Sequence, residues 1–251
     1  MKTALITGSS EGLGSAFAKR LASEDYSITA VARNEDKLKK LVSEIGNKHF
    51  YIVADLATEN GQNKIVQAIS EHHFDLLINN AGIGAVGKFT ELPLQKYEEV
   101  LKLNVETVVK LSYAYLKIAK AGDALINVSS SLAFMPMPAI GLYAATKAFV
   151  TSFSESLWYE QKSRGVYVMG LCPGIMTTNF DDHSGGGLNK PPKWMTQTPE
   201  QVVSTALKAL KNREKPTTFS HFSDKLFTFM FRFYSRKAII STMGKMGNNS
   251  K

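Results

Sequence analysis

Short apolar runs alternate along the chain with longer stretches in which apolar residues recur every three or four positions. The apolar runs fall at residues 3–7, 27–32, 49–54, 76–79, 124–129, 167–172 and 217–220. Between them, residues 14–24 carry apolar side chains at Ala18, Leu21 and Ala22, and residues 37–45 place their leucine, valine and isoleucine side chains on one helical face. This alternation predicts βαβ units, and therefore an α/β protein with a doubly wound parallel sheet of about seven strands and helices on both faces.

Composition limits the class of protein. With 251 residues, of which 44% are hydrophobic, the chain can form one substantial core, so we expect a single domain over residues 1–251. Cys172 is the one cysteine, so no internal disulfide can form. The N-terminus enters a strand without the apolar segment and cleavage site of an export signal, and we expect a cytoplasmic protein.

Charge narrows the range of partners. The net charge of +8 suits nucleic acid, an anionic membrane, or an anionic cofactor or substrate. The basic residues are dispersed and no nucleic-acid motif accompanies them, so we expect no nucleic-acid partner. His72 and His73 have no suitably spaced acid or cysteine beside them, and we predict surface residues and no metal site.

A glycine-rich loop follows the first strand directly. Its expected cofactor contacts are Gly8, Ser10, Glu11, Gly12, Leu13 and Gly14. Glycines between a strand and a helix N-terminus let the backbone approach a pyrophosphate, whose charge the free N–H groups favour. The spacing G-x-x-x-G-x-G differs from the G-x-G-x-x-G fingerprint of dinucleotide sites, so a bare glycine turn is the alternative.

The end of the second strand bears on cofactor choice. Ala32 and Arg33 stand about where an acidic residue would hold the ribose 2′-hydroxyl of NAD, and an arginine there suits the 2′-phosphate of NADP. Glu11 would repel that phosphate. We therefore expect NADP(H) to be preferred, with NAD(H) as the alternative. Asp55, after the third strand, is expected either to accept a hydrogen bond from the adenine amino group or only to cap its loop.

Tyr143 and Lys147 lie one helical turn apart and share a helix face. A nearby ammonium lowers the pKa of a phenol toward the working range, which suits proton transfer to a carbonyl or from an alcohol. The alternative to a catalytic pair is a tyrosine that packs in the core beside a lysine that points into solvent.

Together these motifs carry a family resemblance. The chain resembles the short-chain dehydrogenases/reductases over about residues 1–180, through the glycine loop, Asp55-Leu56, the run Asn79-Asn80-Ala81-Gly82, Asn104, the serines 129–131, Tyr143-x-x-x-Lys147 and Pro173-Gly174. The resemblance implies a Rossmann fold, one NAD(P)(H) and carbonyl–alcohol redox chemistry. It also implies a catalytic tetrad of Asn104, Ser130, Tyr143 and Lys147, with Ser130 chosen because it lies thirteen residues before the tyrosine.

The resemblance also assigns roles. Ser130 and Tyr143 are expected at the substrate oxygen, Lys147 at the nicotinamide ribose, and Asn104 at a water that relays protons. Asn80, Ala81 and Gly82 are expected beside the adenosine ribose, and Leu56 is expected as a further cofactor contact. Pro173, Gly174 and Thr178 are expected near the nicotinamide. Tyr143 and Lys147 thus also count as cofactor contacts, whereas Cys172 is expected to fill the core.

Two segments fall outside the regular pattern. Residues 181–199 are too rich in glycine and proline for a regular element, and we expect a loop over the substrate site or a plain connector. Residues 216–251 form a basic, aromatic C-terminal extension that resembles one found in a bacterial branch of the family. So many aromatic side chains need cover, and we expect this tail to pack on the protein or a partner subunit, with attachment to a membrane surface as the competitor.

The preferred function is therefore an NADP(H)-dependent oxidoreductase that interconverts a carbonyl and a secondary alcohol. Phe134, Met135, Met137 and Leu142 flank the expected site and favour an apolar small molecule. The alternative is a non-catalytic nucleotide-binding protein that serves as a redox sensor or scaffold. Family members commonly associate through the helix after the tyrosine, so the resemblance implies a homodimer or homotetramer, with Trp158 and Tyr159 packed in the core or at that interface.

Overall fold

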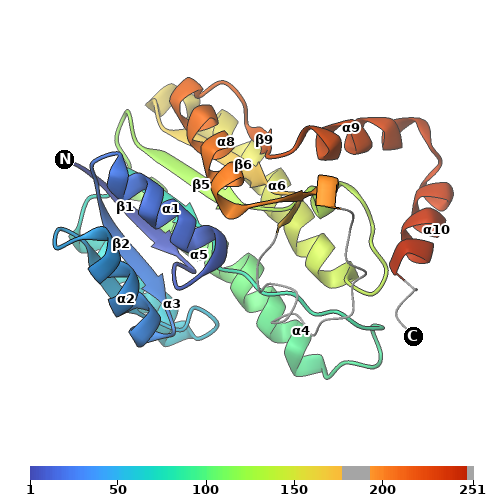
Figure 1. Ribbon diagram of the computed structural model, residues 1–251, viewed down its shortest axis with the longest axis horizontal. Coiled ribbons are helices and arrows are strands. Elements are labelled where there is room, and N and C mark those ends of the chain that lie inside the picture. The colour runs from blue at the N-terminus through green and yellow to red at the C-terminus, as the bar shows by residue number, and fades with distance from the viewer. Residues whose placement is uncertain (177–192, 248–251) are drawn as a thin grey trace.

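One parallel sheet forms the centre of the molecule. The computed structural model describes residues 1–176 and 193–247 (Figure 1). The strands of this sheet are β1 (Lys2–Thr7), β2 (Tyr26–Ala32), β3 (Phe50–Val53), β4 (Leu76–Asn79), β5 (Ala124–Val128), β6 (Tyr167–Cys172) and β9 (Thr217–Phe219), whereas β7 (Ile175–Met176) and β8 (Thr196–Gln197) pair separately. They lie in the order β3-β2-β1-β4-β5-β6-β9, and every neighbouring pair is parallel. The seven-stranded Rossmann-type sheet expected from the sequence is confirmed.

Helices cover both faces of the sheet. On one face lie α1 (Gly12–Ser23), α2 (Glu35–Ile45) and α8 (Pro199–Asn212), and on the other lie α3 (Glu59–Glu71), α5 (Thr107–Ile118) and α6 (Gly141–Gln161). A separate hydrophobic cluster fills each layer. The helix α4 (Leu94–Leu101) stands at the carboxyl end of the sheet and continues into α5 through a π-helical turn, η1 (Lys102–Glu106).

Local sequence explains why these elements form. The strands β4, β5 and β6 are buried along their whole length, as continuous apolar runs in a two-sided parallel sheet should be. Asn34 caps α2 by accepting a hydrogen bond from the N–H of Lys37. A capping box formed by Thr198 and Gln201, with Pro199 in the first turn, starts α8.

The strand order determines where a ligand can bind. Connections run outward in opposite directions from β1 and β4, which makes the gap between them the switch point of the sheet. The loops after β1, β4, β5 and β6 therefore meet at one edge. The glycine loop, Asn79, Ser130 and Pro173 all follow these strands, so the fold brings the expected site together.

The C-terminal segment leaves the sheet after β9. It forms α9 (Phe222–Met230), a 3-10 turn η5 (Phe231–Phe233) and α10 (Arg236–Gly247), which project from the end of the molecule opposite α2 (Figure 1). No residue of α9 is buried. The helix α9 contacts the body at β9 and at the 3-10 helix η2 (Ser131–Phe134), while its aromatic residues are exposed. That the tail packs on the protein or on a partner subunit therefore stays a prediction for α9. In α10, Ile239 and Met243 are buried.

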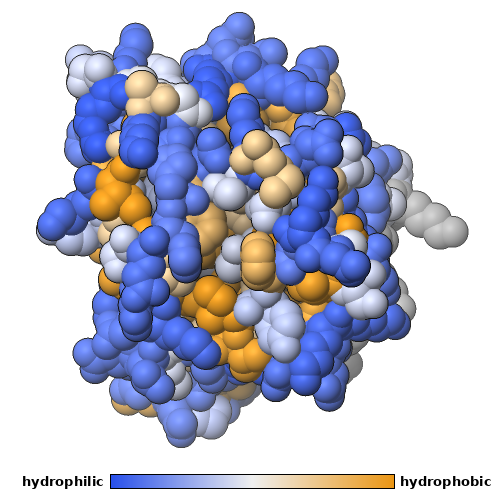
Figure 2. Space-filling view, turned by 90° about the vertical axis from the view of Figure 1, so that its left-hand side faces the viewer, coloured by the Kyte–Doolittle hydropathy of each residue, from blue (hydrophilic) through white to orange (hydrophobic). Residues whose placement is uncertain are grey.

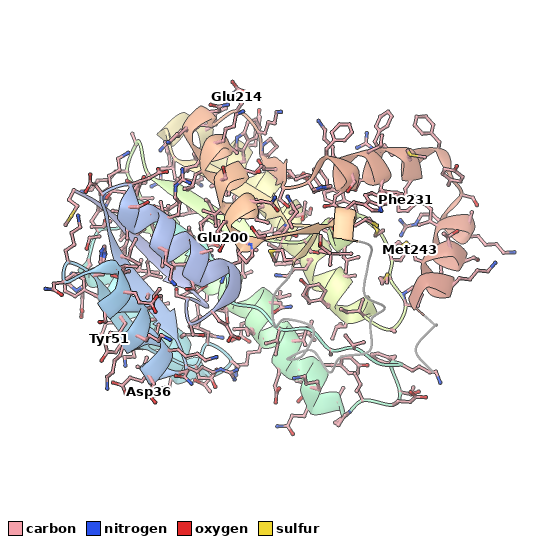
Figure 3. All side chains as sticks on the ribbon, viewed as in Figure 1. Asp36, Tyr51, Glu200, Glu214, Phe231 and Met243 are labelled. Atoms are coloured by element: carbon pink, nitrogen blue, oxygen red, sulfur yellow. The ribbon has the colours of Figure 1, made fainter. Side chains whose placement is uncertain are left out.

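Side-chain orientation shows the same contrast. Aromatic rings along α9 point away from the sheet, whereas Met243 lies on the side of α10 that faces the body (Figure 3). The opposite end of the molecule, formed around α2, is covered mostly by hydrophilic side chains with smaller apolar areas between them (Figure 2). No helix of the described residues is long and apolar enough to cross a membrane.

Candidate active site

The glycine loop joins β1 to the first turn of α1 and contains Gly8, Ser10, Glu11, Gly12, Leu13 and Gly14. Gly8 and Gly12 have φ angles of 68° and 55°, a conformation that L side chains rarely adopt. A Cβ at Gly14 would collide with the carbonyl oxygen of Gly8. The side chain of the N-cap residue, Glu11, makes no capping hydrogen bond to α1. The loop thus leads a compact backbone turn to a helix N-terminus, which is the geometry that favours an anionic group.

A second loop is tied to the first by hydrogen bonds. The hydroxyl oxygen of Thr7 accepts from the N–H groups of Asn80 and Ala81 at 2.9 and 3.0 Å. The Asn80 amide nitrogen donates to the carbonyls of Thr7 and Gly8 at 2.9 and 3.2 Å. Asn79 is buried and donates to Asn127 on the adjacent strand at 2.9 Å, as a structural residue should.

Arg33 lies at the end of β2 with its side chain 71% exposed and 4.0 Å from Asp55. One carboxyl oxygen of Asp55 accepts a hydrogen bond from the N–H of Ala57 at 3.0 Å. This oxygen caps the loop, as the alternative for Asp55 predicts. Glu11 forms an ion pair with Lys37 at 2.6 Å. Lys37, four residues after Arg33 and in the first turn of α2, was not among the expected cofactor contacts. A second cation therefore lies beside the loop and offsets the negative charge of Glu11.

Tyr143 and Lys147 lie in the first two turns of α6 and are both buried. The Lys147 ammonium nitrogen is 5.5 Å from the centre of the Tyr143 ring and donates to the Val128 carbonyl at 2.9 Å. Burial lowers the pKa of Lys147 from its ordinary value to about 8. The alternative, in which the lysine points into solvent, is wrong for this chain, because Lys147 is only 5% exposed.

Asn104 lies in the π-helical turn η1 and is fully buried. Its side chain accepts from the N–H of Ile83 at 3.0 Å and donates to the carbonyl of Ile83 at 2.9 Å and to Thr146 at 3.2 Å. These bonds connect the loop after β4 to α6. A Cβ at Gly82 would lie 3.2 Å from the Asn104 side-chain oxygen and 3.4 Å from the Lys147 nitrogen. The absence of a side chain at Gly82 therefore lets both of these side chains approach the backbone of the loop after β4.

The structure distinguishes the three serines after β5. The Ser129 hydroxyl donates to the backbone carbonyl of Lys147 at 2.7 Å and lies 2.6 Å from the Thr151 hydroxyl, so it is engaged inside the core. The Ser130 hydroxyl accepts from the N–H of Leu132 at 3.2 Å, at the start of the 3-10 helix η2 (Ser131–Phe134). Ser131 is tied by its backbone N–H to the carbonyl of Pro173 at 2.8 Å.

The loop after β6 brings an unpredicted acid to the site. The N–H of Gly174 donates to Ser220 at 3.3 Å, and the carboxyl of Asp224 on α9 occupies the space that a Cβ on Gly174 would take. Burial raises the pKa of Asp224 above its ordinary value, and one of its oxygens is buried without a hydrogen-bond partner. Thr178 and residues 181–192 of the expected loop lie outside the described residues. Cys172 is buried, and burial raises the pKa of its thiol to about 11, as a core residue requires.

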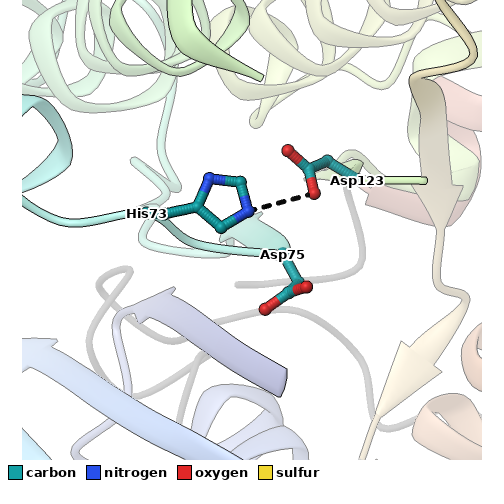
Figure 4. Close-up of side chains that lie close together, drawn as sticks. All are labelled: His73, Asp75 and Asp123. Carbon is teal, nitrogen blue, oxygen red and sulfur yellow. Dashed lines mark ion pairs between the residues drawn. The ribbon is translucent and has the colours of Figure 1, made fainter. Parts of the chain in front are cut away.

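A histidine and two acids meet at the other edge of the sheet (Figure 4). His73 lies 3.4 Å from Asp123, and with Asp75 the three residues bring their side-chain ligand atoms within 4.8 Å of one another. The predicted lack of an acid partner for His73 is wrong, because the fold brings in Asp123 from fifty positions away. The carboxylate of Asp75 accepts from the N–H and hydroxyl of Thr3, and that of Asp123 accepts from the N–H of Lys120. These bonds give the cluster a structural role.

Comparison with known proteins decides the family. The family profile described as short chain dehydrogenase matches residues 2–186. The chain belongs to the short-chain dehydrogenase/reductase family. Among its relatives is the 7beta-hydroxysteroid dehydrogenase of Mediterraneibacter gnavus, 33% identical over 214 residues that cover 82% of this chain and 81% of the relative. Another is the human very-long-chain 3-oxoacyl-CoA reductase, 30% identical over 217 residues that cover 82% of this chain and 68% of the relative.

A solved structure agrees with this placement. The short-chain dehydrogenase from Sphingobium yanoikuyae, in complex with NADPH, superposes with a TM-score of 0.81 at 25% identity and covers 94% of this chain and 97% of its own. The protein described in this structure, as a member of the family, is thus an NAD(P)-dependent oxidoreductase that acts on CH–OH and C=O groups. The oxidoreductase expected from the sequence is confirmed, and the sensor alternative is not favoured.

Proposed function

We propose that this protein is an NADP(H)-dependent oxidoreductase that interconverts a carbonyl and a secondary alcohol on an apolar small molecule. The observation that carries the proposal is the pair Tyr143 and Lys147 at the start of α6, with the Lys147 nitrogen 5.5 Å from the Tyr143 ring, Lys147 buried and its pKa lowered to about 8. In the proposed site, Asn104 and Ser130 complete the catalytic tetrad. An unpaired buried ammonium is costly, and such groups are retained where chemistry uses them.

The residues at this edge fit a dinucleotide. The turn at Gly8 and Gly12 and the N-terminus of α1 would hold the pyrophosphate. Asp55, Leu56 and the loop of Asn80, Ala81 and Gly82 would flank the adenosine, and Lys147, Pro173 and Gly174 would border the nicotinamide half. When bound, the nicotinamide supplies or accepts the hydride.

The remaining chemistry concerns a proton and an oxygen. During reduction the carbonyl oxygen gains negative charge, and the hydroxyls of Ser130 and Tyr143 would donate hydrogen bonds to it, with the Tyr143 proton transferred. The positive charge of Lys147, whose nitrogen is 5.5 Å from the Tyr143 ring, would favour the phenolate that remains. Asn104 would fix the backbone of Ile83 and the start of α6, so that these groups keep their positions.

Two cations support a preference for NADP(H). Arg33 extends into solvent at the end of β2, where the adenosine ribose is expected, and Lys37 stands one turn further along. Glu11 is paired with Lys37, which weakens its repulsion of a 2′-phosphate. The NADPH complex of the Sphingobium yanoikuyae relative is consistent with this choice.

Apolar walls support an apolar substrate. A hollow of about 200 Å³ lies beside the start of α6 and is lined mainly by apolar residues: Ala85, Gly87, Phe89, Tyr97, Pro138, Ala139, Gly141 and Leu142. The rings of Phe134 and Phe219 also contact each other, with their centroids 5.0 Å apart and their planes tilted by 38°. The relatives' names, a hydroxysteroid dehydrogenase and a long-chain 3-oxoacyl-CoA reductase, make steroid-like and long-chain ketones the first candidates.

Exposed apolar residues on α5 and α6 support a homo-oligomer. Tyr113, Phe149 and Tyr159 are exposed, whereas Trp158 packs against both core clusters. Soluble monomers rarely leave such neighbouring helix faces uncovered, and a second copy of the same faces would cover them.

A substrate panel tests the proposal. NADPH oxidation is followed with hydroxysteroid-type ketones, long-chain 3-oxo esters and short polar ketones, and the alcohol product is quantified. We expect turnover with bulky apolar ketones, and slower turnover with polar ones. Binding of NADPH without turnover on any ketone would favour a binding protein over an enzyme.

A further inference from the structure

The helix α9 has its apolar face toward solvent. Phe222, Leu226 and Phe229 of α9 and Phe233 of the adjoining turn η5 recur at helical spacing, and each is between 45% and 77% exposed. We name these four residues the outer stripe. Ordinary surface helices place such a face on the core. The side of α9 that faces the body instead carries Thr228, whose hydroxyl is buried and has no hydrogen-bond partner.

The charge around the outer stripe has one sign. Residues 222–247 carry the cations Lys225, Arg232, Arg236, Lys237 and Lys245, and the one acid among them is Asp224. The Asp224 carboxyl lies against Gly174, on the side of α9 away from the outer stripe. The exposed surface of this segment is therefore apolar and cationic without an intervening acid.

We propose that the outer stripe and its cations dock on the surface of an anionic phospholipid bilayer. Aromatic and aliphatic side chains of an interfacial helix enter the headgroup boundary while lysine and arginine side chains reach the phosphates. A second copy of this chain would bring two like-charged surfaces together, which opposes a self-complementary contact. The described helices cannot span a bilayer, so the contact is one of a helix lying on the surface.

Docking in this way would place the candidate active site at the membrane. The helix α9 packs on η2, which follows Ser130 directly, and its Asp224 lies against Gly174. A lipophilic ketone dissolved in the bilayer would then reach the site without crossing water. This last consequence rests on the proposed function, whereas the docking itself requires no catalysis.

Vesicle flotation tests the docking with the full chain. The protein is mixed with phosphatidylcholine vesicles, with or without phosphatidylglycerol, and the floated fraction is measured at low and high salt. We expect binding to the anionic vesicles that weakens as salt rises, and little binding to neutral ones. A protein that stays with the unbound fraction at low salt, or that floats equally with both vesicles, would overturn the proposal.

Charge reversal provides a matched comparison. Arg232→Glu combined with Lys237→Glu changes the net charge by the same amount as Lys40→Glu combined with Lys208→Glu, two exposed sites on α2 and α8. We expect the first pair to lose anionic-vesicle binding by about tenfold or more and the control pair to lose much less. Equal losses would show that net charge alone attracts the vesicle, which would contradict the proposal.

Removing the apolar side chains separates the membrane from a second copy. In the variant Phe222→Ser/Phe229→Ser/Phe233→Ser we expect vesicle binding to fall while NADPH affinity, which checks folding, stays the same. The oligomer size in vesicle-free buffer should also stay that of the wild type. A wild-type oligomer that this variant dissociates would assign the outer stripe to a protein interface and refute membrane docking.

Discussion

Replacing Lys147 by methionine should raise the free energy of unfolding of the cofactor-free protein at neutral pH, although it removes a residue of the candidate active site. Lys147 is buried and its pKa is lowered from 10.5 to about 8, because burial disfavours the ammonium. Below about pH 8 the folded protein must therefore hold a charge that the unfolded chain solvates freely. Methionine is also long and unbranched, so it can fill the same space without the charge.

The pKa shift gives the size of the effect. A shift from 10.5 to about 8 corresponds to about 3 kcal/mol against the folded state at neutral pH. The variant also leaves the Val128 carbonyl without its 2.9 Å hydrogen bond, at a cost of about 1–3 kcal/mol. The net change at neutral pH is thus a gain of about 0–2 kcal/mol. The pH dependence is sharper, because wild-type stability should rise relative to the variant by about 2 kcal/mol between about pH 7 and about pH 9.5.

Urea unfolding of both proteins across this pH range measures the difference directly. The sign follows from proton binding: above about pH 8 the unfolded chain binds more protons at Lys147 than the folded one, so raising the pH stabilises the wild type. Lys208→Met, at an exposed site on α8, is the control for loss of a lysine. A stability difference between wild type and Lys147→Met that does not change with pH would refute the assignment of a buried, poorly solvated ammonium.

Three further predictions concern the cofactor and the α9 contact. Arg33→Asp should lower NADPH affinity by about tenfold, the lower end for a charge-assisted hydrogen bond, because Arg33 is 71% exposed. Glu11→Gln should instead raise NADPH affinity. Fluorescence titration with NADPH and NADH checks both variants, and a wild type that prefers NADH would contradict the reasoning. Gly174→Ala should cost about 1–3 kcal/mol of stability in urea unfolding, since the new methyl collides with Asp224, and less in an Asp224→Ala background; equal costs in both backgrounds would show that the two residues do not touch. Because burial raises the pKa of Asp224, the wild type should lose stability as pH rises above the ordinary aspartate range, and Asp224→Asn should remove this loss in pH-dependent unfolding.

The fold and most of the site could be predicted because their determinants are local in sequence. Continuous apolar runs specify buried parallel strands, and motifs placed directly after strands are brought to one edge by the sheet order. The choice of Ser130 over Ser129 rests on the spacing usual in the family, and the hydrogen bonds of Ser129 to Lys147 and Thr151 support it, because they engage Ser129 inside the core.

What the sequence could not reveal depends on contacts between distant segments. Lys37 pairs with Glu11 across two elements, and Asp224 reaches Gly174 only because β9 adds to the edge of the sheet. The orientation of α9 was also missed, since a periodic apolar pattern locates a stripe on a helix but does not tell which way the stripe faces. His73 met its acid partner through the pairing of β4 with β5, which sequence spacing did not reveal.

Substitution of Tyr143 by phenylalanine tests whether this tyrosine donates the proton. The change deletes the proposed proton donor and keeps the ring that packs at the start of α6. NADPH titration and turnover on a ketone substrate are measured on one preparation of each protein. We predict an NADPH dissociation constant close to that of the wild type and a turnover lower by about two or more orders of magnitude. Wild-type turnover in the variant would contradict the mechanism and remove Tyr143 from it.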